Sequence, residues 1–256
     1  MRLKTIVLGL LCLCATSCHG QSTPINIKDL SLPAARYGSG EKIVKHKAYT
    51  VSFNKDARIP NWVAWELTPD RCTGPYTRKD ANYDWDPAIK GCPGRSDYQY
   101  STYGYTRGHM CPAMNNRNDI DMMTECFYMS NMCPQSRELN EGTWQSLEIR
   151  CATYAKWYGK VYIVCGPVLS NPEELSEIGR GITCPYRFFK CILRYGTDAN
   201  GNPDKSSIGY LFTQDNDRVR VSVNEIEALT GLDLFCNLPD DEEETIESNT
   251  KETGWR

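Results

Sequence analysis

Histidine is scarce in this chain, and the cysteines are not spaced as zinc ligands. Only three of the 256 residues are histidines, and no Cys-x-x-Cys pair occurs among the ten cysteines between Cys72 and Cys236. Structural zinc sites use closely spaced cysteine and histidine ligands, so the sequence argues against such a site. An even number of cysteines in an exported chain instead favours disulfides. We expect Cys72 to pair with Cys92, because both lie in sequence rich in proline and glycine.

A long hydrophobic run is also missing. The stretch from Ile6 to Cys14 is apolar but too short to span a bilayer as a helix. Basic residues precede it and small residues follow it, as is typical of a secretion signal at residues 1–17. We therefore expect an extracytoplasmic protein that is secreted, periplasmic or lipid-anchored at the cell envelope. The sequence before Cys18 resembles a lipoprotein box that lacks its leucine, so ordinary cleavage and lipid attachment at Cys18 both remain open.

The chain has no excess of basic charge. Its formal net charge is -3, and residues 240–256 are strongly acidic, while basic and acidic residues are equal in number over residues 18–239. Proteins that coat nucleic acid passively normally carry a marked positive charge, so this class is disfavoured. A neutral body is compatible with an enzyme that binds a few phosphates in a local basic cleft and then releases them.

The order of the predicted elements is mixed, which favours an α+β fold over a doubly wound sheet. No internal repeat is visible. We expect a hairpin around residues 54–60, an irregular segment at 18–47, one domain at 48–239 containing a long loop at 68–105, and a disordered acidic tail at 240–256. Alternation and apolar runs predict strands, and helical spacing and capping residues predict helices. The strands are at 49–53, 61–67, 161–165, 188–193 and 208–212, and the helices at 118–125, 139–158 and from about 223 to 231.

Two blocks of sequence carry the candidate chemistry. The first is Thr106-Arg107-Gly108-His109, and the second begins at Asn131, 22 residues after the histidine. A histidine accepts a proton near neutral pH and suits activation of water, although an isolated histidine is more often structural. Arg107 offers a planar fork that matches phosphate oxygens, and Gly108 permits close approach of the backbone. The first block therefore predicts a base beside a cation.

The second block adds a candidate site for a hard metal ion. Asn140 and Glu148 are eight residues apart on the predicted helix, about 12 Å along its axis, and Trp144 lies midway between them. An amide oxygen can ligate Mg²⁺, which keeps most of its water shell, and a carboxylate can hold those waters. Such a donor set is poor for zinc. The alternative is a solvated polar helix face with a half-buried tryptophan.

Together the blocks resemble the sugar-non-specific DNA/RNA endonuclease family, the ββα-metal nucleases marked by Asp-Arg-Gly-His. The family's second block, Asn-x-x-Pro-Gln followed by Leu-Asn-x-Gly-x-Trp and Leu-Glu, matches residues 131–135, 139–144 and 147–148. The likeness covers roughly residues 45–240. It implies that residues 48–239 form an endonuclease domain with the ββα-metal nuclease fold, in which helices flank a central, mainly antiparallel sheet.

The resemblance also implies a role for each candidate residue. The expected activity is that of a DNA/RNA non-specific endonuclease, which hydrolyses phosphodiester bonds with Mg²⁺, or Mn²⁺ as an alternative. The implied roles are His109 as general base, Asn140 as the single direct metal ligand, Glu148 as organiser of the metal's waters, Arg78 and Arg107 as phosphate-binding residues, and Asn131 as a substrate-site residue that orders the loop.

Thr106 departs from the family pattern, because the motif usually begins with aspartate. If the aspartate mainly positions its neighbours by hydrogen bonding, a threonine can partly replace it; if it supplies charge, metal affinity falls. Two alternatives therefore stay open beside the nuclease. One is a catalytically weak relative in the cell envelope that binds nucleic acid or a protein. The other is a disulfide-rich interaction module without chemistry.

Overall fold

The computed structural model describes residues 30–34, 41–250 and 254–255. The predicted signal at 1–17 and the cleavage or lipid site at Cys18 lie outside these residues. Within the described part of the chain, none of the helices is both long and apolar enough to cross a membrane.

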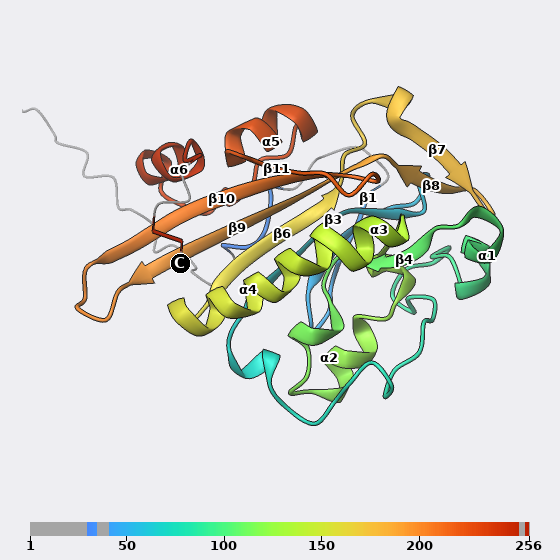
Figure 1. The fold of residues 1–256 in the computed structure, drawn as a ribbon, viewed down its shortest axis with the longest axis horizontal. Helices are drawn as coiled ribbons and strands as arrows, with labels where there is room; N and C mark the ends of the chain where they lie inside the picture. The colour runs from blue at the N-terminus through green and yellow to red at the C-terminus, as the bar shows by residue number, and fades with distance from the viewer. Residues whose placement is uncertain (1–29, 35–40, 251–253, 256) are drawn as a thin grey trace, which may run out of the picture.

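A seven-stranded sheet forms the centre of the molecule (Figure 1), and every neighbouring pair of its strands is antiparallel. The predicted strands and the hairpin around 54–60 are confirmed; the strand predicted at 49–53 is shifted by one residue, and the others are longer than predicted. In spatial order the strands are β1 (Glu41–Lys45), β2 (Thr50–Asn54), β3 (Ile59–Leu67), β6 (Val161–Pro167), β9 (Arg187–Thr197), β10 (Pro203–Thr213) and β11 (Arg218–Val221).

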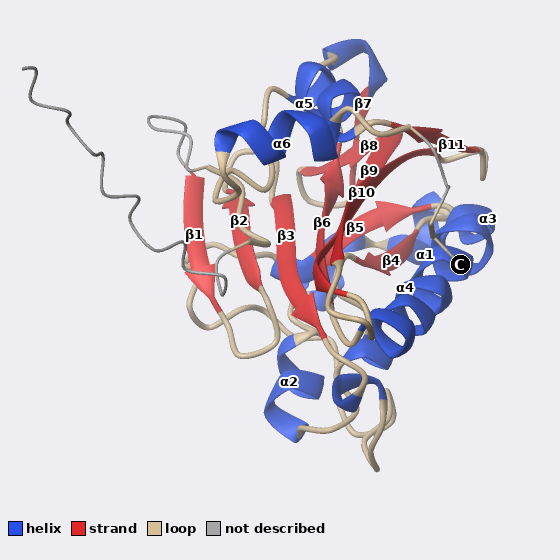
Figure 2. Ribbon diagram, turned by 90° about the vertical axis from the view of Figure 1, so that its left-hand side faces the viewer, coloured by secondary structure: helices blue, strands red, loops and turns tan. Residues whose placement is uncertain are grey.

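Each face of the sheet has its own hydrophobic core, because side chains alternate along a strand. In β3, Val63 and Trp65 belong to one core, whereas Trp62 and Ala64 belong to the other. Helices α5 (Val223–Thr230) and α6 (Asp240–Glu247) cover the second core, and α4 (Gln145–Tyr158) covers the first (Figure 2). The central strands of the sheet are thus buried on both sides, and the candidate residues lie on the α4 side.

The smaller elements complete the layer that contains the candidate residues. Strands β4 and β5 form an antiparallel pair in which Gly108 faces Cys133 and His109 faces Met132. A β-carbon on Gly108 would stand 2.0 Å from the Gln135 side-chain oxygen, so glycine allows Gln135 to pass over the strand. These elements are β4 (Thr106–His109), β5 (Met132–Gln135), β7 (Leu175–Ile178), β8 (Ile182–Pro185), α1 (Tyr100–Tyr103), α2 (Ile120–Glu125) and α3 (Arg137–Leu139).

The predicted helix at 139–158 is not regular. A π-turn at Asn140–Trp144 separates α3 from α4, and Gly142 within it has φ -105° and ψ -114°. Asn216, in the turn between β10 and β11, accepts a hydrogen bond from the Thr143 backbone N–H at 2.7 Å. A β-carbon on Gly142 would lie 2.5 Å from the same oxygen of Asn216. The π-turn therefore depends on a long-range contact that only glycine leaves room for.

Two predicted boundaries are wrong. The segment at 18–47 is not irregular throughout, because β1 pairs with β2 as an edge strand. The acidic tail is not disordered where the structure describes it, because α6 runs over Asp240–Glu247, and Ile246 and Trp255 are buried. Lys205 also holds Glu242 at 2.7 Å. Burial of Ile246 and Trp255 offsets the repulsion between the acidic side chains of this segment.

The expected disulfides are absent from the part of the chain that the structure describes. All ten cysteines there are free, including Cys72 and Cys92, so the predicted pairing is wrong. Seven of the ten are buried, where a thiol behaves as a small hydrophobic group. Burial raises the pKa of Cys111 to about 11 and that of Cys151 to about 12, which keeps both thiols protonated and unreactive.

We predict that Gly142→Ala lowers the free energy of unfolding by about 1–3 kcal/mol, because the new methyl group overlaps Asn216. Gly196→Ala is the matched control, since Gly196 lies in β9 with open space around the position of a β-carbon. Urea unfolding followed by tryptophan fluorescence measures both. Equal stability of the two variants would show that the contact between Gly142 and Asn216 does not constrain the turn.

Candidate active site

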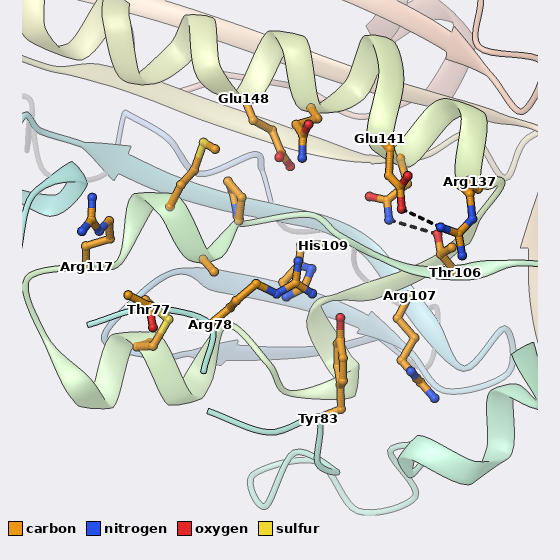
Figure 3. A pocket seen from close by; sticks show the side chains of 16 residues that line it. Thr77, Arg78, Tyr83, Thr106, Arg107, His109, Arg117, Arg137, Glu141 and Glu148 are labelled. Carbon is orange, nitrogen blue, oxygen red and sulfur yellow. Dashed lines mark hydrogen bonds and ion pairs between the residues drawn. The ribbon is translucent and has the colours of Figure 1, made fainter. Parts of the chain in front are cut away.

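Five of the predicted residues line one pocket of about 570 Å³, called the cleft below, between β4 and the helix formed by α3, the π-turn and α4 (Figure 3). Arg78 comes from the long loop at 68–105, and Arg107 and His109 come from β4. Asn140 comes from the π-turn and Glu148 from α4. The two sequence blocks therefore meet across the cleft, as the resemblance implies.

His109 lies in an aromatic setting that keeps its ring neutral. Its ring centroid is 4.9 Å from that of Phe127 and 5.7 Å from that of Tyr83. Burial, and then the charge of Arg78, lower the pKa of His109 from 6.5 to about 3. The Nε2 atom is buried without a hydrogen-bond partner among the described residues. At neutral pH the imidazole is unprotonated and able to accept a proton.

Trp144 connects the helix to the strand that carries His109. Its indole N–H donates a hydrogen bond to the His109 backbone oxygen at 3.0 Å. The indole ring is fully buried and packs edge-on against Phe188 and Phe212. The alternative of a half-buried tryptophan on a solvated helix face is therefore wrong. Trp144 fixes the distance between the π-turn and β4.

Thr106 contacts Asn140 across the same gap. The side-chain N–H of Asn140 donates to the Thr106 hydroxyl oxygen at 3.0 Å. The Thr106 hydroxyl in turn donates to the Gln135 backbone oxygen at 2.8 Å. Both Thr106 and Asn140 line the cleft. A hydroxyl thus occupies the place of the family's aspartate and bonds directly to the predicted metal ligand.

Glu148 points from α4 into the cleft, opposite Arg78 (Figure 3). Only 8% of the residue is exposed, and burial raises the pKa of its carboxyl group to about 7. The charge of buried Lys190 opposes this rise. The Lys190 ammonium lies 3.9 Å from the centroid of the Trp144 ring, a close cation–π contact beneath the helix. A cation in the cleft would favour the ionised form of Glu148.

The cleft is locally basic although the body of the chain is neutral. Four arginines line it against two glutamates. Arg78 is exposed and reaches toward His109, whereas Arg107 stacks over Tyr83 with its guanidinium carbon 4.9 Å from the ring centroid. Arg117 bonds the Gly74 carbonyl, and Arg137 forms an ion pair with Glu141 at 3.2 Å. Of the four arginines, Arg78 is therefore the one that is exposed and reaches toward the His109 ring.

Asn131 does not reach the cleft, which corrects its assignment as a substrate-binding residue. It is fully buried, and its side chain accepts from the Cys111 backbone N–H at 2.9 Å. Its amide nitrogen donates to the backbone oxygens of Cys111 and Cys126. These bonds tie the segment after His109 to the end of α2. The contacts agree with the predicted role in ordering the loop.

The donor set fits a hard divalent cation better than zinc. The described residues contain no group of three or more histidine, cysteine, aspartate or glutamate side chains that could hold a metal. The amide nitrogen of Asn140 is committed to Thr106, which leaves its oxygen as a donor, and a desolvated carboxylate at Glu148 lines the same cleft. One neutral oxygen and one nearby carboxylate suit Mg²⁺ or Mn²⁺, which retain water ligands.

Several contributors to the site were not identified from the sequence. Tyr83 and Phe127 lie in loop sequence without a spacing signal, and Lys190 follows two phenylalanines in an otherwise apolar strand. That lysine is the one detectable clue, because a charge inside a buried strand requires a partner. Arg117 and Asn216 act through contacts distant in the chain, which no local pattern shows.

Comparisons with known proteins agree with this geometry. The sequence model of the DNA/RNA non-specific endonuclease family matches residues 29–241. A nuclease from Serratia marcescens is 27% identical, with 97% of this chain and 95% of that protein covered. A nuclease from a Nostoc strain is 30% identical, with 78% of this chain and 75% of that protein covered.

Mitochondrial and solved relatives extend the likeness. Mouse mitochondrial nuclease EXOG is 27% identical over 78% of this chain and 58% of its own length, so this chain spans about three fifths of that relative. The solved structure of an EndoG/EndoGI complex contains a chain that superposes with a TM-score of 0.71 at 26% identity. The match covers 83% of this chain and 91% of the other.

We predict that His109 stays neutral as the pH falls through 6.5. The unfolded chain takes up a proton there, whereas the folded protein does so only near its lowered pKa of about 3. Stability is therefore intact above pH 6.5 and declines as the pH falls toward 3. NMR titration of the ring measures the pKa, and His109→Asn should lessen the loss of stability between pH 7 and pH 5. A ring that titrates near 6.5 would contradict the prediction.

Proposed function

Because the chain belongs to the DNA/RNA non-specific endonuclease family, we propose that it cuts DNA and RNA internally with little sequence preference. The family comprises metal-dependent nucleases, and we propose Mg²⁺ as the resident ion, with Mn²⁺ able to replace it. The observation that carries the proposal is the convergence of His109, Asn140 and Glu148 on a cleft lined by arginines.

His109 is the general base in this proposal. Its neutral ring accepts a proton from the attacking water, a step that typically contributes about 10²–10⁴-fold to a rate. A pKa of about 3 makes a weak base, but part of that lowering comes from Arg78. When a phosphate anion pairs with Arg78, this part of the repulsion is offset and the imidazole becomes more basic. Substrate binding and activation of the base are thereby coupled.

Arg78 and Arg107 have different parts in phosphate binding. Arg78 is exposed and lies beside His109, so it meets the scissile phosphate and stabilises the charge that builds there. Arg107 stacks on Tyr83, which also packs against His109, and so it supports the wall of the cleft.

Asn140 would supply the direct ligand to the metal, and Glu148 would hold its water molecules. A bound ion would supply Lewis-acid stabilisation of charge on the phosphate and leaving oxygens. Asn140 offers a neutral oxygen from a turn held by Asn216, and Glu148 a carboxylate held by the buried start of α4. Both donors thus project from backbone fixed by packing, which preorganises the site.

We further propose that the protein acts outside the cytoplasm. The sequence before Cys18 supports export, and cleavage or lipid attachment at that residue would decide between release and anchoring. Free cysteines in the described core do not oppose export, because most of them are buried and protonated. Mass spectrometry of the mature N-terminus from envelope and culture medium distinguishes the two routes.

We predict that the purified protein degrades supercoiled plasmid and RNA with Mg²⁺ and stops when EDTA is added. Activity should return when excess Mg²⁺ or Mn²⁺ is supplied, because the donor set holds a hard ion without thiolates. A gel assay with both substrates, with and without metal, measures this. Binding of nucleic acid without cleavage in any metal would favour the catalytically weak relative instead.

We predict that His109→Ala lowers the cleavage rate by about 10²–10⁴-fold while the protein still binds Mn²⁺ and nucleic acid. The reason is that the ring is the base, whereas the metal donors and Arg78 are unchanged. Rates on plasmid DNA at saturating Mg²⁺ are compared with thermal unfolding of both proteins. A His109→Ala variant that folds normally and cleaves at an undiminished rate would contradict the assignment of His109 as general base.

A further inference from the structure

The hydroxyl group of Thr106 makes hydrogen bonds to two partners, the backbone oxygen of Gln135 and the side chain of Asn140. Its oxygen lies 2.8 Å from the Gln135 backbone oxygen and 3.0 Å from the Asn140 side-chain nitrogen. Gln135 pairs with Thr106 in the β4–β5 ladder, so the position of that carbonyl is fixed by backbone. Asn140 belongs to the π-turn, on the other side of the cleft.

Proton accounting sets the orientation of the Asn140 amide. A backbone carbonyl can only accept, so the single hydroxyl proton of Thr106 is directed at Gln135. The hydroxyl then has only lone pairs left for Asn140. Asn140 must therefore present its NH₂ group to Thr106, which turns its side-chain oxygen away from that contact.

We propose that Thr106 is a positioning residue that holds the Asn140 amide with its oxygen free for the metal ion. The inference rests on the proposed function, in which that oxygen is the direct ligand. If the Asn140 amide rotated by half a turn, its NH₂ group would face the cation, and the oxygen ligand would be lost. Thr106 thus acts through orientation, and a neutral hydroxyl suffices where relatives of the family carry an aspartate.

The charge of the cleft agrees with a neutral role for this position. Its two carboxylates are Glu141, which pairs with Arg137, and Glu148. Attraction of the cation therefore rests on Glu148, and Thr106 adds no charge. Changing outer hydrogen-bond partners of metal ligands typically costs 10–100-fold in metal affinity, which sets the expected effect at about this size.

The experiment measures Mn²⁺ binding to the metal-stripped full chain, with free Mn²⁺ followed by electron paramagnetic resonance. Thr106→Val keeps the branched shape for β4 but removes both hydrogen bonds, and Thr106→Ser keeps both. We expect Thr106→Ser to bind like the wild type and Thr106→Val to bind about 10–100-fold more weakly. Cleavage by Thr106→Val should need more metal, while its rate at saturating metal stays close to that of the wild type.

The same Mn²⁺ binding measurement is then made with Thr106→Val in a protein that also carries Asn140→Asp. A carboxylate presents an oxygen in either orientation, so Thr106→Val should no longer weaken Mn²⁺ binding when combined with it. An equal loss in both backgrounds, or wild-type binding by Thr106→Val alone, overturns the inference. Thermal unfolding in EDTA checks the fold, and if Thr106→Val unfolds, Thr106→Ala replaces it in the same cycle.

Asn140→Ala separates this inference from the proposed function. If Asn140→Ala binds Mn²⁺ as tightly as the wild type, the assignment of Asn140 as ligand fails, and the role of Thr106 fails with it. If Asn140→Ala loses binding while Thr106→Val retains it, only the positioning role is wrong. Weak binding by both, with wild-type binding by Thr106→Ser, supports both claims.

Discussion

The hydrogen bond from the Trp144 indole to the His109 backbone oxygen joins the two halves of the site, and the rest of the cleft is built around it. Strand β4 carries His109, the proposed base, and the helix after β5 carries Asn140, the proposed metal ligand, and Glu148. Neither element alone sets the distance between them. A buried ring packed against Phe188 and Phe212 is hard to displace, so the contact anchors the helix to the central sheet as well as to β4.

Two glycines allow this junction to close. Gly108 lets the Gln135 side chain lie across β4, and Gly142 lets Asn216 bond the backbone of the π-turn. In both cases a methyl group would overlap a polar side chain, so the glycines serve close approach and not flexibility. Asn140, the first residue of the π-turn, then bonds Thr106 across the cleft.

The sequence predicted best what local periodicity controls. The strand predicted at 161–165 and most of the helix predicted at 139–158 are present in the structure, because apolar runs and helical spacing reflect burial directly. The π-turn was missed, since its cause lies in Asn216 on a distant turn. The tail at 240–256 was wrongly predicted to be disordered, because its acidic composition was given more weight than its two apolar residues, Ile246 and Trp255, which the structure buries. The convergence of the two blocks came from a family resemblance, not from spacing alone.

The cleft resolves the apparent conflict between a neutral body and a polyanionic substrate. Its arginines concentrate positive charge at one place, whereas basic and acidic residues are equal in number over residues 18–239 as a whole. Burial, and then the charge of Arg78, lower the pKa of His109, so in our proposal a phosphate that pairs with Arg78 makes the imidazole more basic. In this proposal a bound phosphate offsets only the part of the lowering that comes from Arg78, whereas burial lowers the pKa of His109 with or without substrate.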